Sequence, residues 1–311
     1  MQRIGLVFSG GGGKGPYEIG VWRAIEALGL SKDVMAVSGT SVGALNAVLF
    51  AQGDLEKAEK AWLSMSPNDV LSLDLKQLLA HLARNGIKVS PSVLSIIASL
   101  AMYGIFSRDG LLRIIQEYLD ESIVKQKGLP CYACATKLPS FKATYFSLQE
   151  HRQNTVEDIL LASSAIPIVF PIQKVEGKEY LDGFLTDNTP IKPLVDEGCN
   201  IIIVVMLSRA DLLPTDLYPD CKIIPIYPQD APGAALNFRN TAEKMKNGFD
   251  DAMAILTPVF ELMETNYQYS VELQKYKSQS LNYKTLMQGK INTDIGLAES
   301  KLRLLKEMKK W

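Results

Sequence analysis

The sequence predicts an α/β protein with a mainly parallel central sheet. The chain opens with a strand pattern at 3–8, a helix, a second strand at 34–37 and a helix-forming stretch at 44–51. This strand–loop–helix–strand–turn–helix order is typical of a parallel unit, in which the loops after both strands lie at one edge of the sheet. The apolar run within 199–207 is a third observation, because a strand covered on both faces is apolar throughout.

The first strand is followed by a glycine-rich loop at 10–15, and Pro16 then suits the first turn of a helix. A phosphate-binding P-loop is excluded because Gly15 follows Lys14 where serine or threonine is required. A dinucleotide-binding loop lacks its acidic partner, since the second strand ends in Ser38-Gly39. An oxyanion hole, in which bare backbone N–H groups face a carbonyl under attack, is the interpretation we favour.

The second strand ends in Gly39-Thr40-Ser41-Val42-Gly43, the G-x-S-x-G pattern of a nucleophile elbow between a strand and a helix. A serine on so sharp a turn has strained backbone, and glycines on either side relieve the clashes with the flanking strand and helix. The helix that begins at Val42 points its free N–H groups and positive dipole end toward Ser41. That arrangement favours an alkoxide there.

The rest of the chain alternates helical and extended segments. The loop at 163–171 is irregular and apolar, and its two prolines make it a suitable pocket wall. The remaining elements are expected as helices at 54–64 and 155–163, strands at 129–135, 143–148, 178–181, 199–207 and 222–227, and a helical region from 234 onward.

Two helix-rich regions suggest how the chain is divided. Residues 68–124 are expected to form a helical insertion, and the apolar side of its helix at 92–102 fits either core packing or a cap over the active site with a face for acyl chains or lipid. Basic residues predominate at 301–310, which fits a solvated helix end or attachment to anionic lipid. We therefore predict a catalytic domain at 1–230, with the insertion inside it, and a helical C-terminal extension at 231–311.

Composition narrows the class of protein. The chain has 311 residues, 47% of them hydrophobic, and a formal net charge of −1, so no basic field favours nucleic acid. Cysteines 131 and 134 form one C-x-x-C pair, but no second pair completes a zinc site, and we expect Cys131, Cys134, Cys199 and Cys221 to be reduced and structural.

No secretory signal is recognised, and the longest apolar stretch, 93–106, is too short and serine-rich to span a bilayer. These observations predict a cytoplasmic protein, with transient contact at a membrane surface as a further possibility.

A serine nucleophile needs a base, and the chain has only two histidines. No histidine follows His151, as the Ser–acid–His order of α/β-hydrolases requires; His81 lies in the helical insertion and His151 in a strongly polar stretch. A buried carboxylate with a raised pKa is the alternative base. Asp182 is the candidate, because it follows an apolar strand and a tight turn at Gly183 is expected to bring it beside Ser41.

Taken in order, these motifs resemble those of the patatin-like phospholipase family. The loop at 10–15 matches G-G-G-x-[KR]-G, and residues 39–43 match the elbow. Ser164-x-x-x-Pro167-x-x-Phe170-x-Pro171 resembles the proline-rich segment, and Asp182-Gly183 resembles D-G-[GA], with Asn188-x-Pro190 after it. The resemblance covers residues 3–207. It implies a three-layer α/β/α sandwich in which a Ser–Asp dyad cleaves acyl esters of membrane lipids.

The resemblance implies Ser41 as nucleophile, Asp182 as base, and Gly10, Gly11 and Gly12 as oxyanion donors. Gly13, Lys14, Gly15, Gly39, Gly43 and Gly183 would support these motifs, and Val42, Pro167, Phe170 and Phe184 would line the pocket. Phe184 stands where the family has a small residue, so the acyl preference is open. The implied activity is that of a phospholipase A or lysophospholipase acting on phospholipid or lysophospholipid, with no metal or cofactor. There are two alternatives. One is an acyltransferase or thioesterase with the same dyad, and the other is a lipid-binding or regulatory protein whose dyad is idle.

Overall fold

The computed structural model describes residues 3–65, 72–73, 106–107, 109–167, 170–211, 213–235 and 237–261. The chain separates into two compact units, residues 1–254 and residues 255–311. His81, most of the predicted helical insertion and the basic stretch at 301–310 lie outside the described residues. The domain boundary at 230, and the cap, therefore stay predictions.

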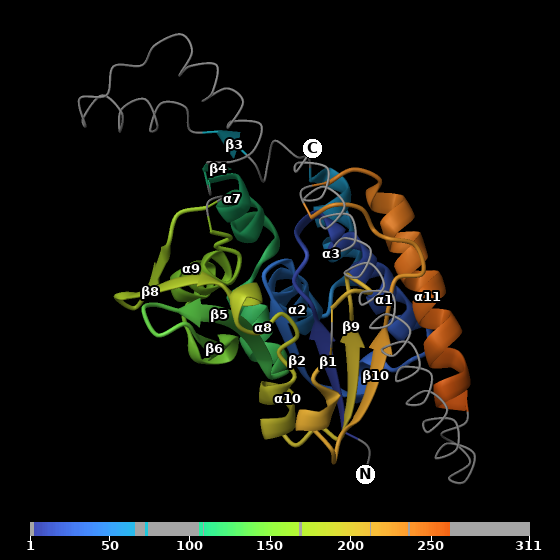
Figure 1. Ribbon diagram of the computed structural model, residues 1–311. Coiled ribbons are helices and arrows are strands. Elements are labelled where there is room, and N and C mark those ends of the chain that lie inside the picture. Colours follow the sequence, from blue (N-terminus) through green and yellow to red (C-terminus); the bar gives the residue numbers. More distant parts are fainter. Residues whose placement is uncertain are drawn as a thin grey trace, which may run out of the picture. The chain divides into compact units, whose positions relative to one another are not determined.

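An eight-stranded sheet forms the centre of the first unit (Figure 1). Four neighbouring pairs, from β10 through β9, β1 and β2 to β5, run parallel, and the strands beyond β5 are antiparallel. The predicted α/β class with a mainly parallel sheet is confirmed. The strands in spatial order are β10 (Lys222–Ile226), β9 (Ile201–Val205), β1 (Ile4–Phe8), β2 (Val34–Thr40), β5 (Cys131–Lys137), β8 (Lys178–Asp182) and β7 (Gln173–Val175), with β6 (Lys142–Ser147) also paired to β5.

Alternation along β1 shows how helices cover both faces of the sheet. Phe8 points to the face where its ring meets Phe50 of α2, while its neighbour Val7 packs in the cluster that contains Leu194 of α10. Helices thus lie on both sides of the strands, as a three-layer sandwich requires. The helices are α1 (Pro16–Ala27), α2 (Val42–Gln52), α3 (Leu55–Ser64), α7 (Asp109–Tyr118), α8 (Glu121–Lys127), α9 (Gln153–Ser163), α10 (Lys192–Asp196) and α11 (Thr241–Glu261).

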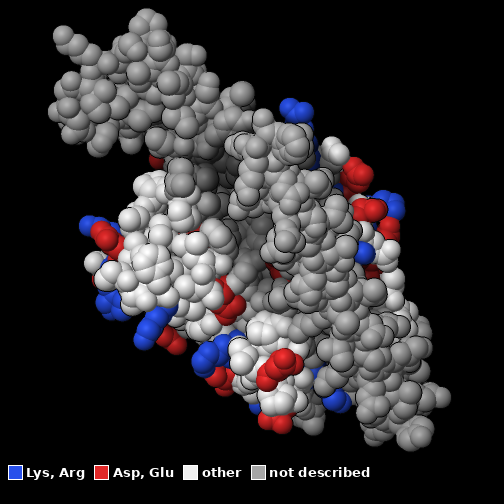
Figure 2. All heavy atoms as spheres, viewed as in Figure 1, with Lys and Arg blue, Asp and Glu red and all other residues white. Residues whose placement is uncertain are grey.

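The distribution of surface charge and the state of the cysteines can be compared with what the sequence predicts. On the face drawn in Figure 2, the acidic and basic side chains of the described residues are interspersed, not gathered by sign. The cysteines at 131, 134, 199 and 221 are all free and buried, and burial raises the pKa of each thiol. Within the described ranges, no helix combines the length and apolarity needed to cross a bilayer. Contact with a membrane surface stays a prediction.

Candidate active site

Ser41 occupies a sharp turn between β2 and α2. Its backbone has φ 57° and ψ −126°, a region that non-glycine residues rarely adopt and that costs about 1–3 kcal/mol. The turn also brings the strand and helix backbones very close together. A Cβ on Gly39 would lie 2.1 Å from the carbonyl oxygen of Gly43, and a Cβ on Gly43 would lie 2.2 Å from that of Phe8. Only glycine fits at either position, and this is the geometry that the G-x-S-x-G pattern predicts.

The structure brings Ser41 and Asp182 together. The Ser41 hydroxyl donates a hydrogen bond to Asp182 Oδ2 at 2.8 Å, and the Phe184 N–H donates to Asp182 Oδ1 at 2.9 Å. The backbone of Asp182 is fixed at both ends, because its N–H donates to the Ala165 carbonyl and its carbonyl accepts from the Thr136 hydroxyl. Both carboxylate oxygens therefore have defined partners, and one of them faces the serine.

Burial changes the acidity of the Asp182 carboxyl. Asp182 has no exposed surface, and burial raises its pKa from 3.8 to about 7, although the hydrogen bonds from Phe184 and Ser41 oppose part of the rise. A base whose pKa lies near the working pH combines the correct protonation state with a useful driving force. Asp182 thus has the properties of a general base without a histidine.

The contacts described for His151 lie elsewhere. Its Nδ1 is 3.6 Å from a carboxylate oxygen of Glu176, and its ring meets Phe146 edge-on. Neither partner belongs to the Ser41–Asp182 pair.

Ser163, the last residue of α9, is a part of the site that sequence reasoning missed. Its Oγ accepts a hydrogen bond from the Ser41 N–H at 2.9 Å and donates one to the Cys134 carbonyl at 2.6 Å. It thereby ties the strained elbow to both α9 and β5. The only signal in the sequence is its place at the end of a predicted helix, just before the proline-rich loop.

The glycine loop lies beside the nucleophile. A Cβ on Gly10 would be 3.3 Å from the Ser41 Cβ. The Gly10 N–H, however, donates to the Asn188 carbonyl at 3.2 Å, so the prediction that Gly10 is an oxyanion donor needs correction: this N–H is already engaged. The N–H groups of Gly11 and Gly12 have no acceptor among the described residues. Their role as oxyanion donors stays a prediction.

The other residues of the loop are held by neighbouring segments. The Gly13 N–H donates to the Ala235 carbonyl at 2.6 Å, and the Lys14 ammonium donates to the Leu207 carbonyl at 3.2 Å. Gly15 precedes α1 and lies against the side chains of Trp62 and Val42. Lys14 therefore serves the loop's own structure here, through a contact with the segment after β9.

The residues predicted for the pocket lie in varied surroundings. Val42 is the buried first residue of α2, Pro167 is half-buried, Phe170 is buried, and Phe184 is 46% exposed in the turn that Gly183 begins. Their role in substrate binding stays a prediction.

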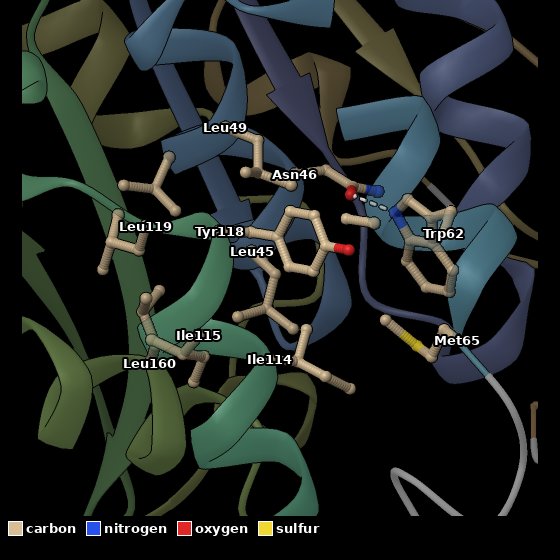
Figure 3. Close-up of a pocket in the computed structure, with 12 residues that line it drawn as sticks. Leu45, Asn46, Leu49, Trp62, Met65, Ile114, Ile115, Tyr118, Leu119 and Leu160 are labelled. Carbon is tan, nitrogen blue, oxygen red and sulfur yellow. Dashed lines mark hydrogen bonds between the residues drawn. The ribbon is translucent and has the colours of Figure 1, made fainter. Parts of the chain in front are cut away.

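The structure has an apolar pocket at a different place, where α2, α3, α7 and α9 converge (Figure 3). Leu45 and Leu49 follow Ser41 at four-residue spacing along α2, and Leu160 precedes Ser163 by three residues on α9. Helix α2 thus connects Ser41 to the pocket, and α9 connects Ser163 to it. Its lining residues are Leu45, Asn46, Val48, Leu49, Ala61, Trp62, Met65, Ile114, Ile115, Tyr118, Leu119 and Leu160.

Comparison with known families agrees with this geometry. The family model described as patatin-like phospholipase matches residues 6–195, and the chain belongs to that family. The matched region contains the glycine loop, the elbow and Asp182. Family membership supports a lipid ester hydrolase.

Individual relatives are distant. The chain is 24% identical over 212 residues to the uncharacterized NTE family protein Rv1063c of Mycobacterium tuberculosis, covering 68% of this chain and 51% of that protein. It is 26% identical over 210 residues to the lysophospholipase NTE1 of Cryptococcus neoformans, covering 68% of this chain and 11% of that protein. Among solved structures, VipD from Legionella pneumophila aligns over 83% of this chain and 67% of its own with a TM-score of 0.45 and 18% identity. The match spans about half the length of the mycobacterial relative.

Proposed function

We propose that this protein is a lipid acyl hydrolase of the phospholipase A or lysophospholipase type, with Ser41 as nucleophile and Asp182 as general base. The observation that carries the proposal is the 2.8 Å hydrogen bond from the Ser41 hydroxyl to a fully buried carboxyl whose pKa is raised to about 7. The proposed substrate class, phospholipid or lysophospholipid, is supported by the family and by the apolar pocket that α2 lines.

The first half-reaction forms an acyl-enzyme. Asp182 takes the hydroxyl proton as Ser41 Oγ attacks the ester carbonyl carbon, and the negative charge moves to the carbonyl oxygen. When the tetrahedral intermediate collapses, the ester bond breaks and the leaving alkoxide takes the proton from Asp182. The products of this step are an alcohol, which carries the rest of the lipid, and an acyl ester on Ser41.

The second half-reaction releases the fatty acid. Water gives a proton to Asp182 as its oxygen attacks the acyl carbon, and collapse breaks the bond to Ser41 Oγ, which recovers the proton. The N–H groups of Gly11 and Gly12 are the proposed donors to the oxyanion of both tetrahedral intermediates. Removal of one such donor lowers kcat by about 10²–10³ in serine hydrolases.

The apolar pocket is the proposed seat of the acyl chain. Its walls are almost entirely aliphatic and aromatic, and Leu45 of its α2 wall lies one helical turn from Ser41. A chain bound there gains about 0.8 kcal/mol for each buried methylene. The pocket thus supports a long-chain acyl ester over a short polar ester as substrate.

Labelling with an alkyl fluorophosphonate tests the nucleophile. We expect the reagent to modify wild-type protein and a Ser140→Ala control, in which an exposed serine is lost, but not Ser41→Ala. Labelling that persists in Ser41→Ala refutes the assignment.

A digest of defined phospholipids and lysophospholipids then identifies the product, and Ser41→Ala provides the blank. Adding alcohol or thiol acceptors and following how the acyl group partitions separates hydrolysis from acyl transfer. Absence of any Ser41-dependent product would favour the idle lipid-binding protein.

A further inference from the structure

Residues 235–244, which lie beyond the matched family region, contact the glycine loop at Gly13. Lys244, near the start of α11, is 5% exposed, and its ammonium donates to the Gly13 carbonyl at 2.8 Å and to the Asn237 carbonyl at 2.5 Å. The Gly13 N–H donates in turn to the Ala235 carbonyl at 2.6 Å. Residues 235–244 therefore form hydrogen bonds with the peptide groups on both sides of Gly13.

Close packing of α11 against α1 sets the position of Lys244 (Figure 1). A Cβ on Gly20 of α1 would lie 1.8 Å from the Met245 carbonyl oxygen, and a Cβ on Gly248 of α11 would lie 2.0 Å from that of Tyr17. The Tyr17 hydroxyl also donates to Asp251 at 2.9 Å. The two helices thus meet backbone to backbone just after Lys244, which leaves its ammonium little freedom to leave the loop.

The hydrogen bonds of the loop connect this ammonium to a proposed oxyanion donor. The Gly13 carbonyl and the Lys14 N–H belong to one peptide group, and the Lys14 N–H donates to the Gly11 carbonyl at 3.3 Å. The Gly11 carbonyl and the Gly12 N–H belong to the next peptide group in this series. Chains of hydrogen bonds polarise one another, so a cation at the Gly13 carbonyl strengthens the Gly12 N–H as a donor at the other end.

The environment of Lys244 fits an electrostatic role. Its two described acceptors are carbonyl oxygens, so its charge is not neutralised by a direct carboxylate contact in the described part of the chain. Burial lowers the pKa of Lys244; Glu243 opposes this shift, and the positive charge of Lys14 adds to it. A buried ammonium costs free energy unless it is well hydrogen-bonded. Two lysines, 14 and 244, thus bring positive charge to the glycine loop.

We propose that Lys244 is a positioning residue of the oxyanion hole. Lys244 holds the Gly11–Gly13 turn and polarises the Gly12 N–H through the intervening peptide groups. This inference rests on the proposed Ser41 hydrolase. It assigns part of the catalytic machinery to residues 235–244, outside the family region at 6–195. It predicts that Lys244 acts on the transition state and not on substrate binding.

The test uses the full chain with Lys244→Met, which keeps the length of the side chain and removes the ammonium. Lys246→Met is the matched control, because Lys246 lies two residues further on α11, is exposed and pairs with Asp250. For hydrolysis of a soluble ester we expect Lys244→Met to lower kcat about tenfold with KM nearly unchanged, less than the loss of a whole donor. Lys246→Met should match wild type, and Lys244→Arg should recover part of the loss.

A transition-state analogue separates this role from simple support of the fold. Ser41 Oγ adds to the carbonyl of an alkyl trifluoromethyl ketone, Asp182 takes the proton, and the ketone oxygen becomes an oxyanion in the hole. We expect Lys244→Met to weaken inhibition by this ketone by the same factor as kcat, while binding of the matching secondary alcohol, which forms no oxyanion, stays the same.

Several outcomes overturn the inference. A folded Lys244→Met with normal kcat, or with equal losses for the ketone and the alcohol, would show that Lys244 does not act on the oxyanion. If that variant does not fold, Lys244→Gln, which keeps a donor without charge, takes its place, and failure of both to fold makes Lys244 a stability residue only. Wild-type protein that shows no Ser41-dependent hydrolysis refutes the proposed function instead.

Discussion

Replacing Asp182 by asparagine should stabilise the folded protein while it abolishes hydrolysis. The carboxyl is fully buried, and its pKa rises from 3.8 to about 7 on folding. Ionisation therefore favours the unfolded chain. Asparagine carries no charge and can keep both hydrogen bonds, since its oxygen can accept from the Phe184 N–H and its amide can donate to Ser41 Oγ.

The magnitude follows from the two pKa values. Below pH 3.8 the carboxyl is protonated in both states and costs nothing. Between 3.8 and about 7 only the unfolded state ionises, and the folded state loses about 1.4 kcal/mol of relative stability per pH unit. Above about 7 both states ionise and the cost is constant at about 4 kcal/mol. The stabilising effect of asparagine should therefore be small in acid and full in mild alkali.

Urea unfolding measures this difference. We expect Asp182→Asn to gain about 1–2 kcal/mol over wild type near pH 5 and about 4 kcal/mol near pH 9. Asp33→Asn, which removes the same charge from an exposed position, is the matched control measured alongside. A gain for Asp182→Asn that is the same at both pH values, or a loss of stability in alkali, would refute the link between burial and the raised pKa.

Three further predictions concern the base, the pocket and the elbow. Wild-type kcat/KM for a soluble ester should fall about tenfold per pH unit below about pH 7 and level off above it, because protonated Asp182 cannot accept a proton; a plateau that extends well into acid contradicts this assignment. Ile115→Trp should fill the apolar pocket and lower the ratio of long-chain to short-chain hydrolysis, and an unchanged ratio in chain-length assays would place the acyl chain elsewhere. Ser163→Ala should leave the buried Ser41 N–H without its acceptor and cost about 1–3 kcal/mol in urea unfolding, together with a lower kcat. Ser164→Ala, which loses bonds only within its own helix, should leave kcat unchanged, and equal losses in both variants would argue against a special role for Ser163.

Local steric rules explain why much of the fold and the elbow could be predicted. The elbow requires glycine at 39 and 43 because any Cβ there would clash with a backbone carbonyl oxygen. A requirement of this kind is visible in one short stretch of sequence. The apolar run of β9 and the alternation of strand and helix patterns likewise reflect local burial. Predicted strands such as 129–135 and 178–181 differ from β5 and β8 by no more than two residues at either end.

Contacts between distant segments explain what could not be predicted. The Gly10 N–H is engaged by the carbonyl of Asn188, and a backbone carbonyl carries no sequence signal. Lys244 lies 231 residues from the glycine whose carbonyl it binds, on a helix that reads as an ordinary polar extension. The pocket needs four helices to converge, and no single one of them predicts it.

Alkylation of the four buried cysteines can be used to follow unfolding of the protein. Thiolate is the form that alkylating reagents attack, and burial raises the pKa of every cysteine in the chain, so the native fold should resist iodoacetamide. Cysteines 131 and 134 lie on β5. Cysteines 199 and 221 lie just before β9 and β10, which β1 and β2 separate from β5. The order in which the pairs gain alkyl groups in mild urea would show which side of the sheet opens first.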